Sequence, residues 1–239
     1  MEHLKTYEIG VSPPDLKRVL GGELPQNLLG PLQAMAAGLT ARARRGPVSL
    51  YLCATDDDRE TRDYFGAVLA RTLQNQVPDT LLVDCDFLAA GLSGLVPQHD
   101  ALGFLDMLLY GSSLGAIKQA SPGGISVIGA GSFPVTRNSP FVMDVFVSAA
   151  RYLGSHSKCV IYCGPVLDDE LEVHPILAHV DLPVLLRVGE AAGGRDAVEE
   201  KVAQAGQETM WCVRLVAGAR GAEPAPPAEP APPAEPAPP

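Results

Sequence analysis

The segment from residue 56 to residue 62 concentrates side chains that could do chemistry. It holds seven consecutive charged or hydroxyl-bearing residues: Asp56, Asp57, Asp58, Arg59, Glu60, Thr61 and Arg62. Carboxylate oxygens in a row are ligands that a divalent cation accepts. Aspartates are also favoured at the start of a helix, where they accept hydrogen bonds from backbone N–H groups. We interpret this segment as an acidic loop that caps a helix beginning near Arg59.

A second acidic pair, Asp84 and Asp86, follows the apolar run TLLV. These carboxylates could join the first group around a metal ion, but carboxylates without phosphate oxygens rarely hold Mg²⁺ tightly. The histidines are scattered, and the five cysteines lie in or beside apolar runs at irregular spacing. Such cysteines are typical of small core residues in a reducing compartment. We therefore expect neither a metal nor a cofactor.

The elements that would position these side chains can be predicted from the apolar pattern. Short, nearly continuous apolar runs indicate strands that are buried on both faces. They occupy residues 48–54, 80–86, 125–131, 158–164, 182–189 and 210–218. Residues with helical spacing precede or separate them, at 27–43, 61–73, 103–110, 139–153 and 195–207. This alternation predicts a three-layer α/β fold with a mostly parallel sheet, in which ligands bind at the carboxyl ends of the strands.

Composition narrows the possible functions. The net charge of −10 disfavours binding to a phosphate backbone, and 5% aromatic residues offer few platforms for stacking bases. No apolar stretch approaches the length that spans a bilayer, and the first residues do not resemble a secretory signal. We expect a cytoplasmic protein that binds no nucleic acid and does not insert directly into a membrane.

The chain divides into three parts by composition. Residues 1–47 are broken by Pro13-Pro14 and Gly21-Gly22, and we interpret them as an adaptor segment. Residues 48–218 form the α/β domain. Residues 219–239 are a disordered tail that contains AEPAPP three times, a composition that favours extended polyproline II. This tail is either an inert extension or a docking segment for a protein that recognises proline.

The order of the segments resembles the P-loop ATPase domain of the bacterial tyrosine kinases of capsule and exopolysaccharide synthesis, which is related to the MinD/ParA ATPases. The most specific part is residues 80–189. TLLVDCDF resembles the family's strand that ends in D-x-D, and LSGLVPQHDALGFLDMLLYGSSLGAIKQ resembles the loop and short helices that follow. ISVIGAGSFPV, KCVIYCGPV and LPVLLRVG resemble later strands, in the family's order. The resemblance implies a P-loop NTPase-like fold.

The residues that carry catalysis in that family are missing. A working P-loop has the pattern G-x-x-x-x-G-K-[ST], whose glycines and lysine cradle phosphates. Here Asp57 and Arg59 replace the glycines, Glu60 stands at the lysine position, and only Thr61 keeps its hydroxyl. A negative side chain facing a triphosphate costs several kcal/mol even at an effective dielectric constant of about 20.

Other family features are also altered. At the Walker B position, where the family has an aspartate, we place Tyr162, which is neutral at pH 7. Asp84 and Asp86 match the second acidic motif. No tyrosine follows Tyr162, so the C-terminal cluster of phosphate acceptors is absent from this sequence. The P-loop fold is therefore expected in a degenerate form, as a pseudo-ATPase or pseudokinase that is not an enzyme.

The resemblance implies a regulatory or scaffold subunit of an exopolysaccharide synthesis or export system, at the inner face of the membrane through a partner. Its partners would be co-polymerase or export proteins, with homo- or hetero-oligomers as a further option. The acids Asp56, Asp57, Asp58 and Glu60 would face a basic partner. Two alternatives stay open: a MinD/ParA-like positioning adaptor, and an active kinase or ATPase whose lysine has moved to Lys118 or Lys158.

Overall fold

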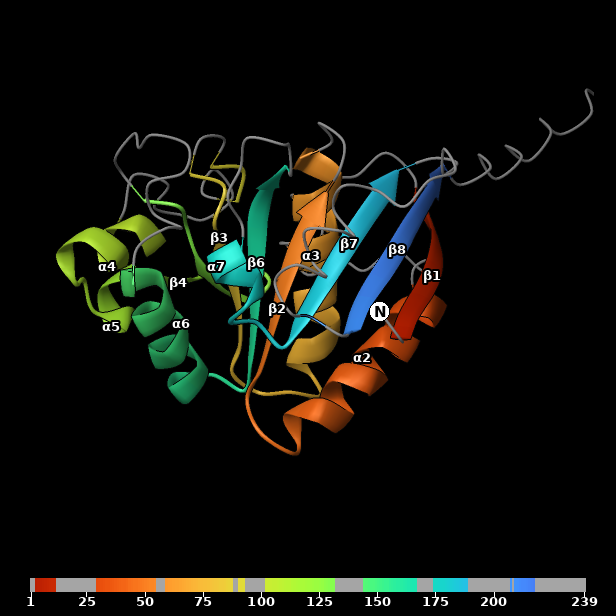
Figure 1. Ribbon diagram of the computed structural model, residues 1–239, viewed down its shortest axis with the longest axis horizontal. Coiled ribbons are helices and arrows are strands. Elements are labelled where there is room, and N and C mark those ends of the chain that lie inside the picture. Colours follow the sequence, from red (N-terminus) through yellow and green to blue (C-terminus); the bar gives the residue numbers. More distant parts are fainter. Residues whose placement is uncertain are drawn as a thin grey trace, which may run out of the picture.

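A single twisted sheet forms the centre of the molecule (Figure 1). The computed structural model describes residues 3–11, 29–54, 59–87, 90–92, 102–131, 144–166, 174–188, 207 and 209–217. Within these residues the strands are β1 (His3–Val11), β2 (Val48–Ala54), β3 (Thr80–Asp84), β4 (Lys118–Ala120), β5 (Ser126–Ile128), β6 (Cys159–Val166), β7 (Leu182–Val188) and β8 (Thr209–Ala217). They pair in the order β1-β8-β7-β2-β6-β3-β5-β4.

The strand directions confirm the predicted fold class. Every pair is parallel except β4–β5, which is antiparallel at one edge. Each of the six predicted strands is present, with bounds that differ by a few residues at most. Central strands such as β2 and β3 are buried along nearly their whole length because helices cover both faces of the sheet. The architecture is the three-layer α/β arrangement of P-loop NTPases.

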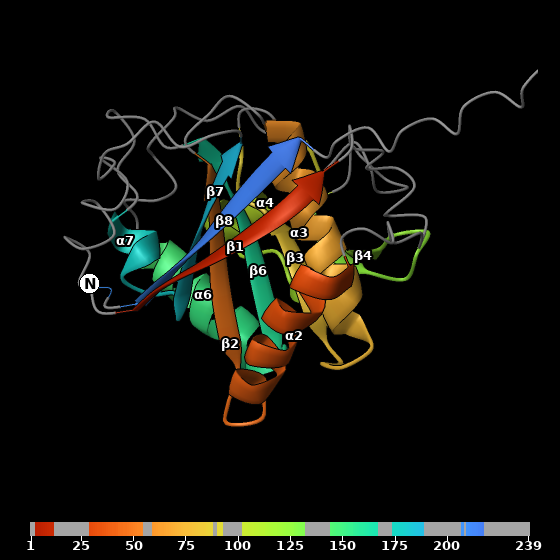
Figure 2. The ribbon, with the colours of Figure 1, turned by 90° about the vertical axis from the view of Figure 1, so that its right-hand side faces the viewer.

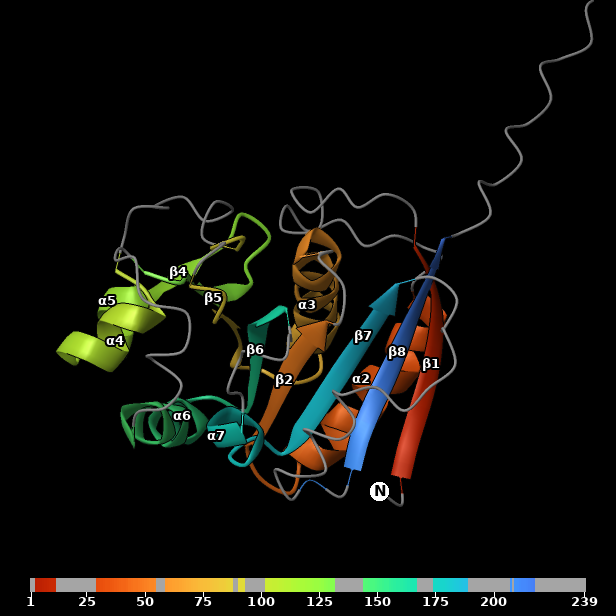
Figure 3. The same cartoon turned by 45° about the horizontal axis from the view of Figure 1, so that its top comes forward.

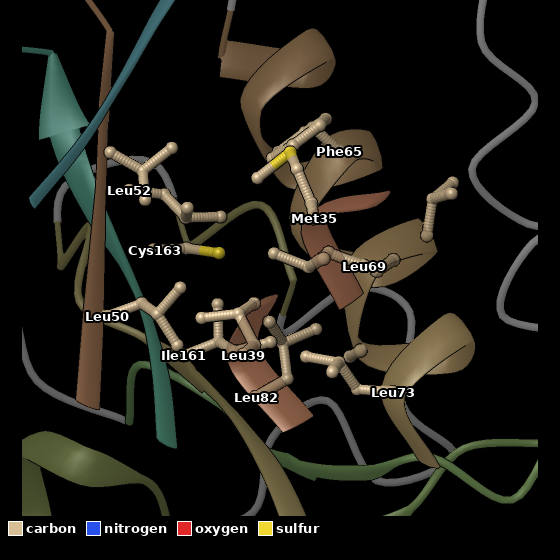
Figure 4. Packing of buried hydrophobic residues seen from close by; sticks show 14 of the residues in the cluster. Met35, Leu39, Leu50, Leu52, Phe65, Leu69, Leu73, Leu82, Ile161 and Cys163 are labelled. Carbon is tan, nitrogen blue, oxygen red and sulfur yellow. The ribbon is translucent and has the colours of Figure 1, made fainter. Parts of the chain in front are cut away.

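One face of the sheet is covered by α2 (Leu29–Ala43) and α3 (Arg59–Gln74) (Figure 2). Their apolar side chains pack against strand residues such as Leu50, Leu82 and Ile161 (Figure 4). At Gly66 the helix α3 approaches β6 closely, since a Cβ there would lie 2.7 Å from the Cys163 sulfur. This close approach brings the first turn of α3 against the carboxyl ends of the central strands.

The opposite face carries four shorter helices: α4 (Phe104–Tyr110), α5 (Leu114–Ile117), α6 (Asp144–His156) and α7 (His174–Leu177). An aromatic cluster fills the space beneath them. The ring of Phe104 lies 5.8 Å from Phe146 and 6.1 Å from Tyr162, centroid to centroid. The predicted helices at 103–110 and 139–153 correspond to α4 and α6, whereas residues 139–143 and nearly all of the predicted helix at 195–207 lie outside the described residues.

The N-terminal segment differs from the adaptor that we expected in residues 1–47. Strand β1 forms the edge of the sheet and pairs with β8 along its whole length, from His3 opposite Thr209 to Val11 opposite Ala217. Helix α2 buries Leu32, Met35 and Leu39 in the main core. Both elements belong to the folded unit, since β1 pairs with β8 and the apolar side chains of α2 pack against the sheet, so the boundary at residue 47 falls inside that unit. The tail at 219–239 lies outside the described residues.

Candidate functional site

A buried arginine occupies the carboxyl ends of β2, β3 and β6. Arg62 lies in the first turn of α3 and its side chain is 0% exposed. It precedes Phe65 and Leu69 by three and seven residues, so it stands on the helix face that points into the core. An arginine at an inward-facing position of a helix needs compensating partners, because an isolated buried charge is very costly.

The guanidinium of Arg62 finds those partners on three elements. Its Nε and Nη2 donate to Oδ1 of Asp63, at 3.0 and 2.8 Å. Its Nη1 donates to Oδ2 of Asp86, at 3.0 Å, and to the backbone carbonyl of Gly164. Hydrogen bonds between ionised groups are short and strong, and a planar guanidinium fixes their directions. The contacts therefore tie the start of α3 to the ends of β3 and β6.

Asp84, the last residue of β3, organises the loop that follows it. Its Oδ1 accepts a hydrogen bond from the Asp86 N–H at 3.0 Å, and its Oδ2 accepts one from the Leu92 N–H, also at 3.0 Å. Gly91 makes this loop possible, since a Cβ at that position would overlap the carboxylate of Asp63. Asp84 and Asp86 therefore have structural roles in this chain: Asp84 binds the backbone of the loop, and Asp86 binds Arg62.

Burial and neighbouring charges both shift pKa values within the arginine–aspartate cluster, which comprises Arg62, Asp63, Asp84 and Asp86. Burial raises the pKa of Asp84 to about 7, and the neighbouring Asp63 adds to the increase. For Arg62, burial alone would lower the pKa, but Asp63, Cys163 and Asp86 raise it above its ordinary value. The arginine is always charged, while Asp84 changes its protonation near neutral pH.

Tyr162, the residue that we place at the Walker B position, does not face the arginine–aspartate cluster. It points to the opposite face of the sheet, where it packs in the aromatic cluster with Phe104 and Phe146. Successive side chains of a strand alternate between faces, so the next residue, Cys163, points toward α3, and its thiol interacts electrostatically with Arg62. Burial raises the pKa of the Cys163 thiol, so the residue facing the cluster is uncharged.

Two buried hydroxyls near this end of the sheet lack hydrogen bonds. Tyr51 and Tyr162 are partners in the β2–β6 register, and neither hydroxyl has a hydrogen-bond partner in the structure as described. The ring of Tyr51 packs directly over Gly164, where a Cβ would overlap it. Glycine at 164 is therefore required for the carbonyl that Arg62 uses and the ring of Tyr51 to lie so close together.

The structure describes the remaining predicted site residues only in part. Asp56, Asp57 and Asp58 lie outside the described residues. Arg59, Glu60 and Thr61 form the first turn of α3, but only their backbone is described. The helix start that we expected near Arg59 is confirmed.

Neither candidate for a relocated lysine has a described contact with the cluster. Lys158 precedes β6, so it lies at the amino ends of the strands, opposite the cluster. Lys118 is exposed at the start of β4, on the outer edge of the sheet.

Sequence reasoning missed the partnership of Arg62 with Asp63, although it singled out Asp84 and Asp86. The available signal was the position of Arg62 on the apolar face of its helix, in register with Phe65 and Leu69.

In the parts of the chain that the structure describes, no group of three or more His, Cys, Asp or Glu side chains is arranged to hold a metal ion. None of the described helices combines the length and apolar character that crossing a bilayer requires.

The fold defines an α/β protein of the P-loop NTPase-like class. No protein-family model matches the sequence, and no curated protein matches it. Among solved structures, the kinase domain of the Escherichia coli tyrosine kinase ETK superposes with a TM-score of 0.71 at 17% identity, covering 90% of each chain. The chimerical protein CapA2B2 gives a TM-score of 0.71 at 12% identity, covering 88% of this chain and 93% of the other.

The BceF tyrosine kinase domain is a third similar structure. It superposes with a TM-score of 0.61 at 15% identity, covering 79% of this chain and 78% of that one. At these identities the likeness establishes a shared fold. The chain therefore has the fold found in bacterial tyrosine kinase domains.

Proposed function

We propose that this protein is a non-catalytic pseudo-ATPase that serves as a regulatory or scaffold subunit of a bacterial exopolysaccharide synthesis or export system. The observation that carries the proposal is the arginine–aspartate cluster at the carboxyl ends of the strands. In P-loop proteins this edge of the sheet receives the phosphates and the magnesium ion.

The cluster supports the loss of catalysis because Arg62 already pairs with two of its carboxylates and offsets part of their negative charge. Arg62 supplies a permanent positive charge to Asp86 and Asp63, the role that a bound cation or a P-loop lysine would otherwise fill. Asp84 is committed to two backbone N–H groups. Cys163, which faces the cluster, carries no carboxylate for a metal-bound water, and Glu60 replaces the P-loop lysine in sequence.

Titration with ATP and Mg²⁺ tests this proposal directly. We expect isothermal titration calorimetry of the full chain to show no saturable binding at millimolar nucleotide, because acids stand where phosphates need positive charge. The BceF or ETK kinase domain is the matched positive control. A micromolar dissociation constant for ATP would overturn the pseudo-ATPase proposal in favour of an active enzyme with a non-standard P-loop.

The placement in a polysaccharide system rests on two further observations. The sequence resembles the capsular and exopolysaccharide tyrosine kinases over residues 80–189, and the fold is shared with bacterial tyrosine kinase domains. In such a system a folded but silent member occupies the place of a kinase subunit beside its co-polymerase. Its function then depends on its surfaces.

The acidic segment before α3 is the surface that we assign to a basic partner. Replacing Asp56, Asp57 and Asp58 by serine should weaken co-purification with co-polymerase or export proteins at low salt, while circular dichroism stays unchanged. Opposite charges across an interface are sensitive to screening, so added salt should mimic the triple variant. Asp144→Ser, an exposed acid at the start of α6, is the control that should bind normally. Undiminished co-purification of the triple variant would exclude this segment as the contact.

A further inference from the structure

An open apolar groove runs between α4 and α6, on the face of the sheet opposite α2 and α3. Its volume is about 500 Å³, and Met107, Leu108, Val145 and Tyr152 contribute apolar surface to it. Serine hydroxyls lie among them, at Ser112, Ser113 and Ser148. A mostly apolar groove with a few hydroxyls suits an extended peptide that offers small apolar side chains.

The large exposed apolar side chains identified in the described part of the chain all lie on or beside α4 and α6: Leu102, Leu109, Tyr110 and Tyr152. Of these, Tyr152 lines the groove. Tyr110 is 65% exposed and Tyr152 is 42% exposed. The ring of Tyr152 packs 4.2 Å from that of His156, which holds it in place. A pre-positioned aromatic ring at the edge of an apolar groove is the surface that proline-rich segments recognise.

The chain itself contains a segment of matching chemistry, at residues 222–239. Polyproline II has three residues per turn, so every third residue lies along one edge of the helix. One edge of the three AEPAPP repeats consists entirely of proline: Pro224, Pro227, Pro230, Pro233, Pro236 and Pro239. A second edge is entirely alanine, and the third alternates glutamate with proline. In the polyproline II conformation the repeat would therefore be amphipathic, with its carboxylates on one edge.

We propose that the Ala/Glu/Pro repeats of residues 222–239 dock, within the same chain, into the α4–α6 groove as a polyproline II helix. The proline and alanine edges face the groove, with proline rings against Tyr152. This inference does not depend on the proposed function.

The dimensions allow this docking within one chain. A repeat of six residues spans roughly 19 Å in polyproline II, close to the roughly 20 Å length of α6. The carboxyl end of β8, at Ala217, lies four strands away from β3, or about 19 Å at the usual strand spacing. Figures 1 and 3 show β8 and the α4–α6 pair toward opposite ends of the sheet. The 22 residues from 218 to 239 extend to about 68 Å, which exceeds that separation.

Charge favours the same arrangement. Arg151 is exposed and follows Ser148, which lines the groove, by three residues on α6, so it lies on the helix surface next to the groove. The glutamates Glu223, Glu229 and Glu235 repeat along one edge of the tail, and any of the three can meet this arginine. Three equivalent repeats also raise the fraction of molecules in which the groove is occupied. The short connection between β8 and the repeats keeps the effective concentration of the repeats at the groove high.

Paramagnetic relaxation in the full chain tests the docking. The substitution Ala237→Cys places a single reactive thiol in the tail, because the five native cysteines are buried. With a nitroxide on that thiol, we expect the amide signals of Gly111, Ser148 and Tyr152 to lose most of their intensity, and to recover when the nitroxide is reduced. The variant Tyr152→Ala, at an aromatic residue that lines the groove, should abolish the loss. Leu102→Ala, an exposed apolar residue that does not line the groove, should not.

A mixture separates docking within one chain from docking between chains. Spin-labelled chain without ¹⁵N is mixed with unlabelled ¹⁵N chain, and no loss of signal in α4 and α6 is expected. Loss of signal in this mixture would overturn the intramolecular proposal and assign the groove to the tail of a second copy. Full intensity in the singly labelled chain would overturn tail docking altogether and leave the groove to a separate partner.

Discussion

Replacing Arg62 by methionine should destabilise the protein by roughly 3–5 kcal/mol, the usual consequence of removing one partner from a buried ion pair. Methionine fills much of the same volume but leaves Asp63 and Asp86 without the guanidinium that their carboxylates contact. The loss should be larger at pH 8 than at pH 5, because burial raises the pKa of the neighbouring Asp84 to about 7, so Asp84 adds a further negative charge to the cluster only at the higher pH. Urea unfolding at both pH values measures the effect.

Arg71→Met on the same helix provides the matched control. Arg71 is only half-buried and donates to the Gly123 carbonyl at 2.6 Å and to Gln74 at 3.2 Å. We expect its loss to cost about 1 kcal/mol, with little dependence on pH. Should Arg62→Met prevent folding, Arg62→Lys retains the charge without the planar fork and should fall between the two. A loss below that of the control would contradict the central role of Arg62.

Asp84→Asn should flatten the dependence of stability on pH. The pKa of Asp84 rises from 3.8 to about 7 on folding because of burial, and then because of Asp63. Between these values the folded chain keeps a proton that the unfolded chain has released. The contribution of Asp84 to stability is therefore fully present below about pH 4 and falls by about 1.4 kcal/mol per pH unit until the pH passes the folded value. The side chain of asparagine does not titrate, so the variant lacks this dependence of stability on pH.

The expected result is a difference in slope between wild type and variant. Asparagine can accept only one of the two backbone N–H bonds, so the variant should be less stable than wild type at pH 5. Its deficit should shrink as the pH rises to 7.5, as measured by urea unfolding at intervals across that range. Asp79→Asn, in the exposed turn before β3, should give a curve parallel to wild type. Parallel curves for both variants would show that Asp84 does not titrate in this window.

Much of the fold follows from local patterns in the sequence. The six strands that we predicted, β2, β3, β5, β6, β7 and β8, are apolar runs, and most of their described side chains are buried. The helix at Arg59 follows three aspartates, which favour a helix start at that point. The N-terminal strand could not be inferred in this way. Its neighbour in the sheet is β8, about 200 residues away in sequence, and pairing across such a distance leaves no local pattern.

In the candidate site, too, some features follow from local sequence and others depend on contacts between distant segments. Asp84 at the end of β3, Asp86 just after it and the charged loop before α3 are visible as a sequence motif, because their spacing sets them at the ends of a strand and a helix. The positively charged partner is not visible, because Arg62 meets Asp86 and the Gly164 carbonyl only after two strands and a helix have assembled. Likewise, strand register alone determines that Cys163 faces α3 and that Tyr162 faces the aromatic cluster.

The sequence by itself determined the fold class, the acids at the strand ends, the charge changes in the P-loop segment and the composition of the tail. Each of these depends on residue type and on spacing over a few residues, which the local chain geometry translates directly into structure. Tertiary structure decided which charges compensate one another and where exposed tyrosines gather on α4 and α6. Those properties arise from contacts between distant segments, since burial and proximity exist only once the layers have packed.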